Sequence, residues 1–120
     1  MARRDITGAV DFGYLETYAA GDVGLVDEVL GLFREQAALW EPLMDPAAEG
    51  WRDAVHTLKG AARGVGAFDL ADACEAAEAR DLPDGVLAAR LLAVRDALDR
   101  ALADIAAYAH ERALQGLQGG

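Results

Sequence analysis

The residues best suited to chemistry in this sequence surround a single histidine. The segment from Trp51 to Val65 carries apolar residues at helical spacing, and on a projection of about 100° per residue His56 lies about 140° from the centre of that apolar face. The same outer face holds three cations and a glycine, namely Arg52, Lys59, Gly60 and Arg63. The sequence therefore predicts an exposed histidine in a positively charged setting, not a histidine buried in a core.

An exposed imidazole is a nitrogen nucleophile at neutral pH. The ordinary pKa of a histidine side chain is about 6.5, so much of such a ring is uncharged near pH 7. Neighbouring cations favour an anionic electrophile, and Lys59 is placed to reach a phosphoryl oxygen while a nitrogen of His56 attacks phosphorus. The pattern predicts phosphoryl transfer through His56, with no cofactor or metal on this chain if the partner supplies the metal.

Gly60 is the least expected residue of this outer face. Glycine inside an exposed helix costs about 1 kcal/mol relative to alanine, and this sequence uses alanine freely elsewhere. One helical turn after His56, the missing side chain leaves room for a partner surface to approach the imidazole. We therefore interpret Gly60 as part of a binding surface.

The elements that must position these residues are helices. Alanine is the commonest residue, and no stretch shows the alternation typical of a strand. Apolar residues recur at spacings of three and four between capping residues and helix breakers, which predicts helices at about 11–20, 22–44, 50–65, 67–80 and 84–114 and a frayed tail at 115–120. The expected fold is one all-α domain over residues 1–120, an antiparallel four-helix bundle with a short extra N-terminal helix.

Composition argues against several classes of protein. Asp and Glu number 21 against 11 Lys and Arg, and the net charge of −10 disfavours general nucleic-acid binding. No run approaches the roughly 20 apolar residues of a membrane span, and no apolar signal-peptide stretch follows Met1, so we expect a cytoplasmic protein without membrane contact. Cys74 is the only cysteine and lies on an apolar stripe, so neither a disulfide nor a metal cluster is expected. We expect a monomer.

The run from His56 to Ala67, HTLKGAARGVGA, resembles the signature of histidine-containing phosphotransfer (HPt) domains of bacterial two-component phosphorelays. It combines the histidine, a lysine three residues later, a glycine four residues later and Gly66 ten residues later. The expected order and lengths of the helices from about residue 11 to residue 113 also resemble the whole family fold.

The resemblance implies a role for each of these residues. His56 would take a phosphoryl group from an aspartyl phosphate on one response-regulator receiver domain and pass it to another, and the chain would have no kinase activity of its own. Lys59 would stabilise the phosphoryl group, and Glu78, 22 residues after the histidine, would orient the ring. Arg52, Gly60 and Arg63 would contribute to binding. A sensor or hybrid histidine kinase and receiver domains would be the partners, with Mg²⁺ on the receiver.

Three other interpretations remain open from the sequence. A glutamate at position 78 is also typical of phosphoacceptor domains served by a separate chemotaxis-type kinase domain. A helical adapter could retain the fold for docking signalling proteins and transfer nothing, although such a binder has little need of His56, Lys59 and Gly60 in register. An acidic bundle that dimerises through its apolar stripes is the third.

Overall fold

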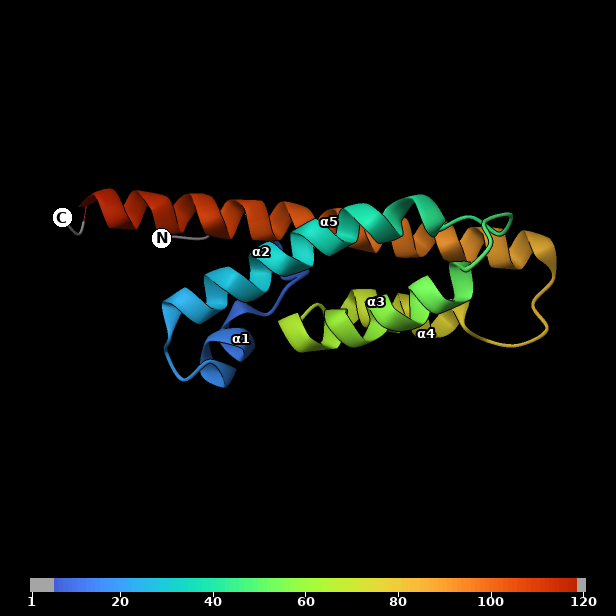
Figure 1. Ribbon diagram of the computed structural model, residues 1–120, viewed down its shortest axis with the longest axis horizontal. Coiled ribbons are helices and arrows are strands. Elements are labelled where there is room, and N and C mark those ends of the chain that lie inside the picture. The colour runs from blue at the N-terminus through green and yellow to red at the C-terminus, as the bar shows by residue number, and fades with distance from the viewer. Residues whose placement is uncertain (1–5, 119–120) are drawn as a thin grey trace.

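The described residues, 6–118 of a computed structural model, form helices joined by short connections, without strands. Figure 1 shows the longer helices arranged lengthwise, with the longest running along the whole molecule. The elements are α1 (Phe12–Tyr18), α2 (Val23–Trp40), the short 3₁₀ helix η1 (Glu41–Leu43), α3 (Trp51–Val65), α4 (Phe68–Ala77) and α5 (Asp84–Gln118).

Capping residues define several of these helix ends. The side chain of Asp11 accepts a hydrogen bond from the Tyr14 amide at 3.0 Å, and that of Asp22 accepts one from the Leu25 amide at 3.1 Å, so each aspartate caps the helix that follows it. Gly66 ends α3 in the left-handed conformation with φ of 87°. These local signals place the start of α2 and the end of α3 within one residue of the expected positions.

Other helix ends differ from the expected ones. The second helix ends at Trp40 and tightens into η1 instead of continuing to residue 44, because Pro42 lacks the amide that a continuing α-helix requires. The first spans Phe12–Tyr18 rather than 11–20, and α4 stops at Ala77 rather than at residue 80. The tail expected to fray from residue 115 continues α5 to Gln118, since one glycine among good helix formers does not end a helix. Residues 119–120 lie outside the described part.

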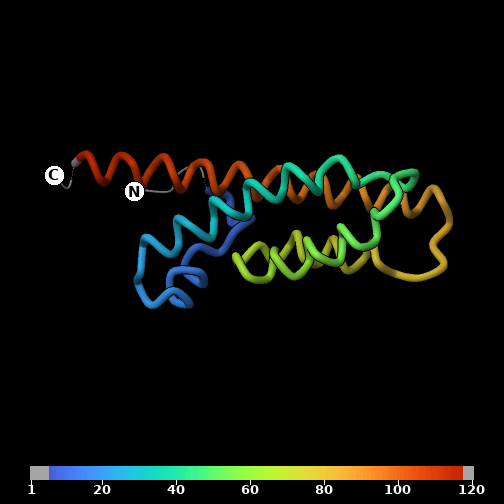
Figure 2. Tube along the Cα trace, in the orientation of Figure 1, coloured from blue at the N-terminus to red at the C-terminus, as the bar shows by residue number. Residues whose placement is uncertain are grey.

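Helices α2 to α5 alternate in direction along the molecule, as the colour gradient in Figure 2 shows. Contacts join α2 to α3, α3 to α4, α4 to α5 and α5 back to α2, so the four helices enclose one core, and α1 packs against α2 and α3. The largest fully buried side chains of this core include Leu58, Leu70, Leu91, Leu98, Ile105 and Tyr108. A helix of 35 residues is about 52 Å long, so α5 accounts for most of the 55 Å length of the molecule.

The N-terminal segment, residues 7–11, is joined to this core by two sets of hydrogen bonds. Asp104 is fully buried, and its carboxylate accepts hydrogen bonds from the amides of Thr7, Gly8 and Val10 and from the Thr7 hydroxyl. The amide of Asp11 donates to the carbonyl of Gly66 at 2.9 Å. A Cβ at Gly66 would lie 2.7 Å from the Asp11 carbonyl oxygen, so this close approach requires glycine.

Candidate functional site

His56 projects from the outer face of α3, and its side chain is 70% exposed. Val55 and Leu58, its neighbours on the opposite face, are fully buried in the core. The amphipathic pattern of α3 therefore fixes which way the histidine points, as the helical projection predicts. A ring this exposed is accessible to a group on another protein.

Glu78, the C-cap residue of α4, holds the inner side of the histidine ring. Its Oε2 atom lies 2.9 Å from Nδ1 of His56, and its own side chain is only 18% exposed. A carboxylate only accepts hydrogen bonds, so Nδ1 carries the hydrogen and donates it. In the neutral ring Nε2 then has no hydrogen, and its lone pair is available for attack.

Lys59 binds the other oxygen of the same carboxylate. Its Nζ lies 2.8 Å from Oε1 of Glu78 in a close ion pair that lacks the alignment of a regular hydrogen bond, and the lysine side chain is 16% exposed. Burial alone raises the pKa of Glu78, but the contacts with Lys59 and His56 outweigh it, and the pKa of Glu78 is lowered from its ordinary value. The carboxylate is therefore charged at neutral pH, which keeps it an acceptor for Nδ1.

Two of the expected binding residues lie beside the histidine on the exposed surface of α3. Among residues 6–118, a Cβ at Gly60 would have no neighbouring atom within 4 Å beyond the adjoining helix backbone, so packing in this part of the chain gives no reason for a glycine there. Arg63 is half-exposed, and its Nη2 lies 3.6 Å from Oε1 of Glu75, a loose surface pair. Neither residue contributes to the contacts that hold the ring, and both leave their outer surface open to a partner.

Arg52 lies exposed on α3, as expected, and also contacts the end of α4. Its Nη1 donates to the backbone carbonyl of Glu78 at 2.9 Å, and its guanidinium lies 4.8 Å from the centre of the Trp51 ring. Arg90 on α5, which no sequence pattern marks, donates to the carbonyl of Ala76 at 2.7 Å. An arginine that binds a distant backbone carbonyl leaves no pattern in the sequence, so only the packed structure identifies these contacts.

Cys74 lies one turn before Glu78 and is fully buried. Burial, together with the nearby charge of Glu78 and against that of Lys59, raises the pKa of the Cys74 thiol to about 12. The thiol is therefore protonated at neutral pH, and Cys74 serves as a small core residue.

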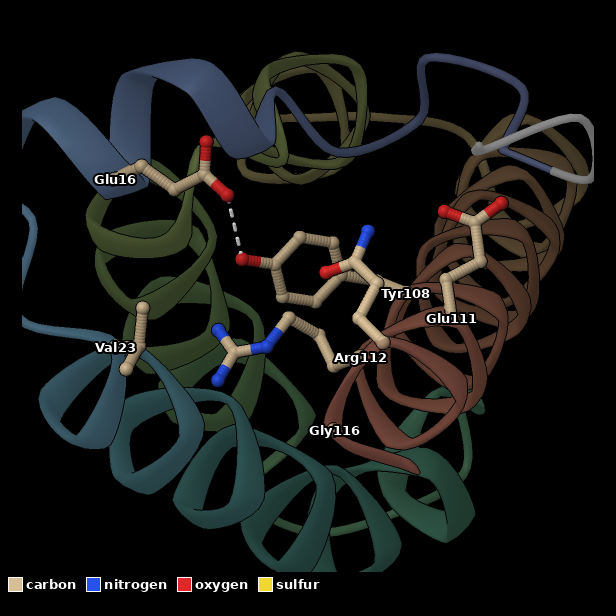
Figure 3. A pocket seen from close by; sticks show the side chains of 7 residues that line it. Glu16, Val23, Tyr108, Glu111, Arg112 and Gly116 are labelled. Carbon is tan, nitrogen blue, oxygen red and sulfur yellow. Dashed lines mark hydrogen bonds between the residues drawn. The ribbon is translucent and has the colours of Figure 1, made fainter. Parts of the chain in front are cut away.

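A separate cavity of about 370 Å³ lies between α1, α2 and the C-terminal part of α5 (Figure 3). Tyr108 donates to Glu16 at 2.6 Å across it, with Arg112 beside the tyrosine ring. None of its lining residues belongs to α3 or α4, which carry His56 and Glu78. In residues 6–118, no group of three or more His, Cys, Asp or Glu side chains could hold a metal ion, and no helix is long and apolar enough to cross a membrane.

An exposed histidine held by a carboxylate on a helical framework is the arrangement expected of a histidine-containing phosphotransfer domain. The Hpt domain family model matches residues 26–110, and the chain belongs to this family of two-component phosphorelay proteins. Among solved structures, the chain is similar to the histidine phosphotransferase ShpA from Caulobacter crescentus, with 64% sequence identity and a TM-score of 0.82. That match covers 92% of this chain and 99% of ShpA. A search of curated proteins found no significant match.

Proposed function

We propose that this chain is a phosphorelay carrier that accepts a phosphoryl group on Nε2 of His56 from a receiver-domain aspartyl phosphate and passes it to the aspartate of another receiver. The observation that carries the proposal is the 2.9 Å contact between Nδ1 and Glu78, which leaves Nε2 unprotonated on an exposed ring. Membership of the Hpt family supports the same role. The alternating directions of α2 to α5 support the antiparallel four-helix bundle as its framework.

The proposed transfer step needs only groups that the chain and its partner hold. The lone pair of Nε2 attacks phosphorus, a P–N bond forms, and the bond from phosphorus to the aspartyl oxygen breaks, which releases the receiver carboxylate. The ring nitrogens then carry one phosphoryl group and one hydrogen, so the ring gains positive charge. The Glu78 carboxylate, already bonded to Nδ1–H, stabilises that charge.

Cations assist the same step. The ammonium of Lys59 pairs with Glu78, the carboxylate that holds the histidine ring. We assign to Lys59 the additional role of stabilising the incoming phosphoryl group. We assign Mg²⁺ to the receiver and no cofactor to this chain. The carrier is proposed to be a monomer without autonomous kinase activity that works in the cytoplasm between a sensor or hybrid histidine kinase and its receivers.

The test mixes the protein with an aspartyl-phosphorylated receiver and follows acid-labile, base-stable phosphate on the wild type and on the His56→Gln variant. We expect label on the wild type alone, with equal circular dichroism and melting temperature for both proteins because His56 makes no core contact. Label on His56→Gln would refute the assignment of the acceptor. If the folded wild type takes no label from any receiver, the relay role is wrong, and addition of a chemotaxis-type kinase domain with ATP then separates a kinase-served acceptor from a non-transferring adapter.

A further inference from the structure

Glu78 stands at a helix end, where side chains are usually least well held. It is the C-cap residue of α4, and the chain beyond it leaves the helix and turns, with Asp81 in the left-handed region at φ of 60°. The last carbonyls of any helix lack partners within the helix, and helix ends fray. A residue that orients the histidine from such a position needs additional support.

Two arginines, one on α3 and one on α5, supply contacts to this helix end. Arg52 on α3 donates to the Glu78 carbonyl at 2.9 Å, and Arg90 on α5 donates to the Ala76 carbonyl at 2.7 Å. Both bonds satisfy carbonyls that the helix leaves open, and both place a positive charge at the negative end of the helix dipole. The end of α4 is thereby tied to the two helices that flank it.

The contacts from α3 converge on one residue. Arg52 binds the backbone oxygen of Glu78, His56 binds Oε2 and Lys59 pairs with Oε1, so three side chains of α3 hold all three oxygens of Glu78. Arg52 lies one helical turn before His56, and the Trp51 ring at 4.8 Å supports its guanidinium. The backbone position of Glu78 is thus fixed from the same helix surface that presents the histidine.

We propose that Arg52 and Arg90 are positioning residues, which fix the end of α4 so that the Glu78 carboxylate keeps the hydrogen of His56 on Nδ1 and leaves Nε2 reactive. This inference rests on the proposed function of His56. It differs from a docking role for Arg52 because the arginine acts here through Glu78 and touches neither the phosphoryl group nor the partner.

The test uses two readouts that do not depend on a receiver, and a receiver titration of Arg52→Ala then checks for a docking role. Long-range ¹⁵N–¹H spectra report which ring nitrogen of His56 carries the hydrogen, and phosphoramidate, a small phosphoryl donor that loses ammonia when the P–N bond to the histidine forms, reports the intrinsic reactivity of Nε2. The variants are Arg52→Ala, Arg90→Ala, the double variant and Arg52→Lys, with Arg95→Ala, an exposed arginine on α5, as the matched control.

We expect each alanine variant to shift hydrogen from Nδ1 toward Nε2 and to slow phosphorylation by phosphoramidate about twofold to fivefold, with a larger effect in the double variant. Arg52→Lys should recover most of the rate, because an ammonium also donates to a carbonyl, and Arg95→Ala should match the wild type. Circular dichroism checks that every variant is folded.

Two results would overturn the proposal. The first is a folded double variant with the wild-type tautomer and the wild-type rate. The second is an Arg52→Ala variant that raises the receiver concentration needed for half-maximal transfer but keeps the phosphoramidate rate, since that pattern belongs to a docking residue. A wild type that reacts with phosphoramidate but with no phosphorylated receiver would instead refute the relay function, and the tautomer comparison would still decide the role of the arginines.

Discussion

Removal of the Glu78 carboxylate should slow phosphorylation of His56 while the fold is retained. The hydrogen bond from Nδ1 to Oε2 is 2.9 Å long and has a charged acceptor, and such bonds contribute about 1.5–3 kcal/mol. Because the His56 ring is 70% exposed, the lower end applies, and a loss of about 1.5 kcal/mol corresponds to a rate roughly tenfold lower for Glu78→Ala.

The Glu78→Gln variant should have an intermediate rate. Its amide oxygen still accepts a hydrogen bond from Nδ1, and a bond to a neutral acceptor is about half as strong as one to a charged acceptor, so we expect a rate about threefold to fourfold below that of the wild type. Both variants leave Lys59 without its carboxylate, and its long side chain can turn toward water. The melting temperature should therefore fall by only a few degrees.

The assay follows phosphorylation by phosphoramidate at fixed concentration and records the tautomer of His56 in the same samples. Glu75→Ala is the matched control, because Glu75 is an exposed glutamate on the same helix that pairs with Arg63 and not with the histidine. The reasoning is refuted if Glu78→Ala reacts as fast as the wild type, or if its rate falls while the hydrogen stays on Nδ1. The second result would mean that Glu78 acts by charge alone and does not orient the ring.

Three further predictions concern neighbouring residues. Gly60→Leu should retain the wild-type melting temperature and phosphoramidate rate, because no side chain of the described residues lies within 4 Å of a Cβ at this position, and it should raise the receiver concentration for half-maximal transfer at least about tenfold. Normal transfer from a receiver would contradict the interpretation that Gly60 leaves room for the partner. Cys74, with its pKa raised to about 12, should react with iodoacetamide near pH 8 at least about a hundredfold more slowly in the folded than in the unfolded protein, as mass spectrometry can measure. Because the pKa of Glu78 is lowered, the glutamate stabilises the fold relative to Glu78→Gln above about pH 4.5, and this difference in the free energy of unfolding decreases as the pH falls through the folded pKa. Urea unfolding that gives the same difference near pH 3 and pH 7 would contradict this sign.

The part of the site that lies on one helix could be predicted from the sequence. Helical periodicity alone places His56, Lys59 and Gly60 on one outer face of α3, because residues three and four apart on a helix are neighbours. The position of Glu78 relative to His56 came from the family resemblance and not from periodicity, since it depends on how α4 packs against α3. The structure brings the two side chains to 2.9 Å.

The contacts of the arginines could not be predicted, because their partners are backbone carbonyls and every residue has one. The end of α2 was predictable in principle, since Pro42 lacks the amide that a continuing α-helix requires. The end of α5 could not be predicted, because a glycine such as Gly116 can either terminate a helix or be tolerated inside one.

The attachment of the N-terminal segment has a consequence for how such domains diversify. Its anchors are hydrogen bonds, in which backbone amides within residues 7–11 donate to the buried carboxylate of Asp104 and to the carbonyl of Gly66. The position of α1 therefore depends on these anchors and on its own buried side chains, Phe12 and Leu15, and not on its most exposed positions. Exposed positions of α1 such as Tyr18 can change over evolutionary time, and with them the surface offered to different partners, while the helix keeps its place.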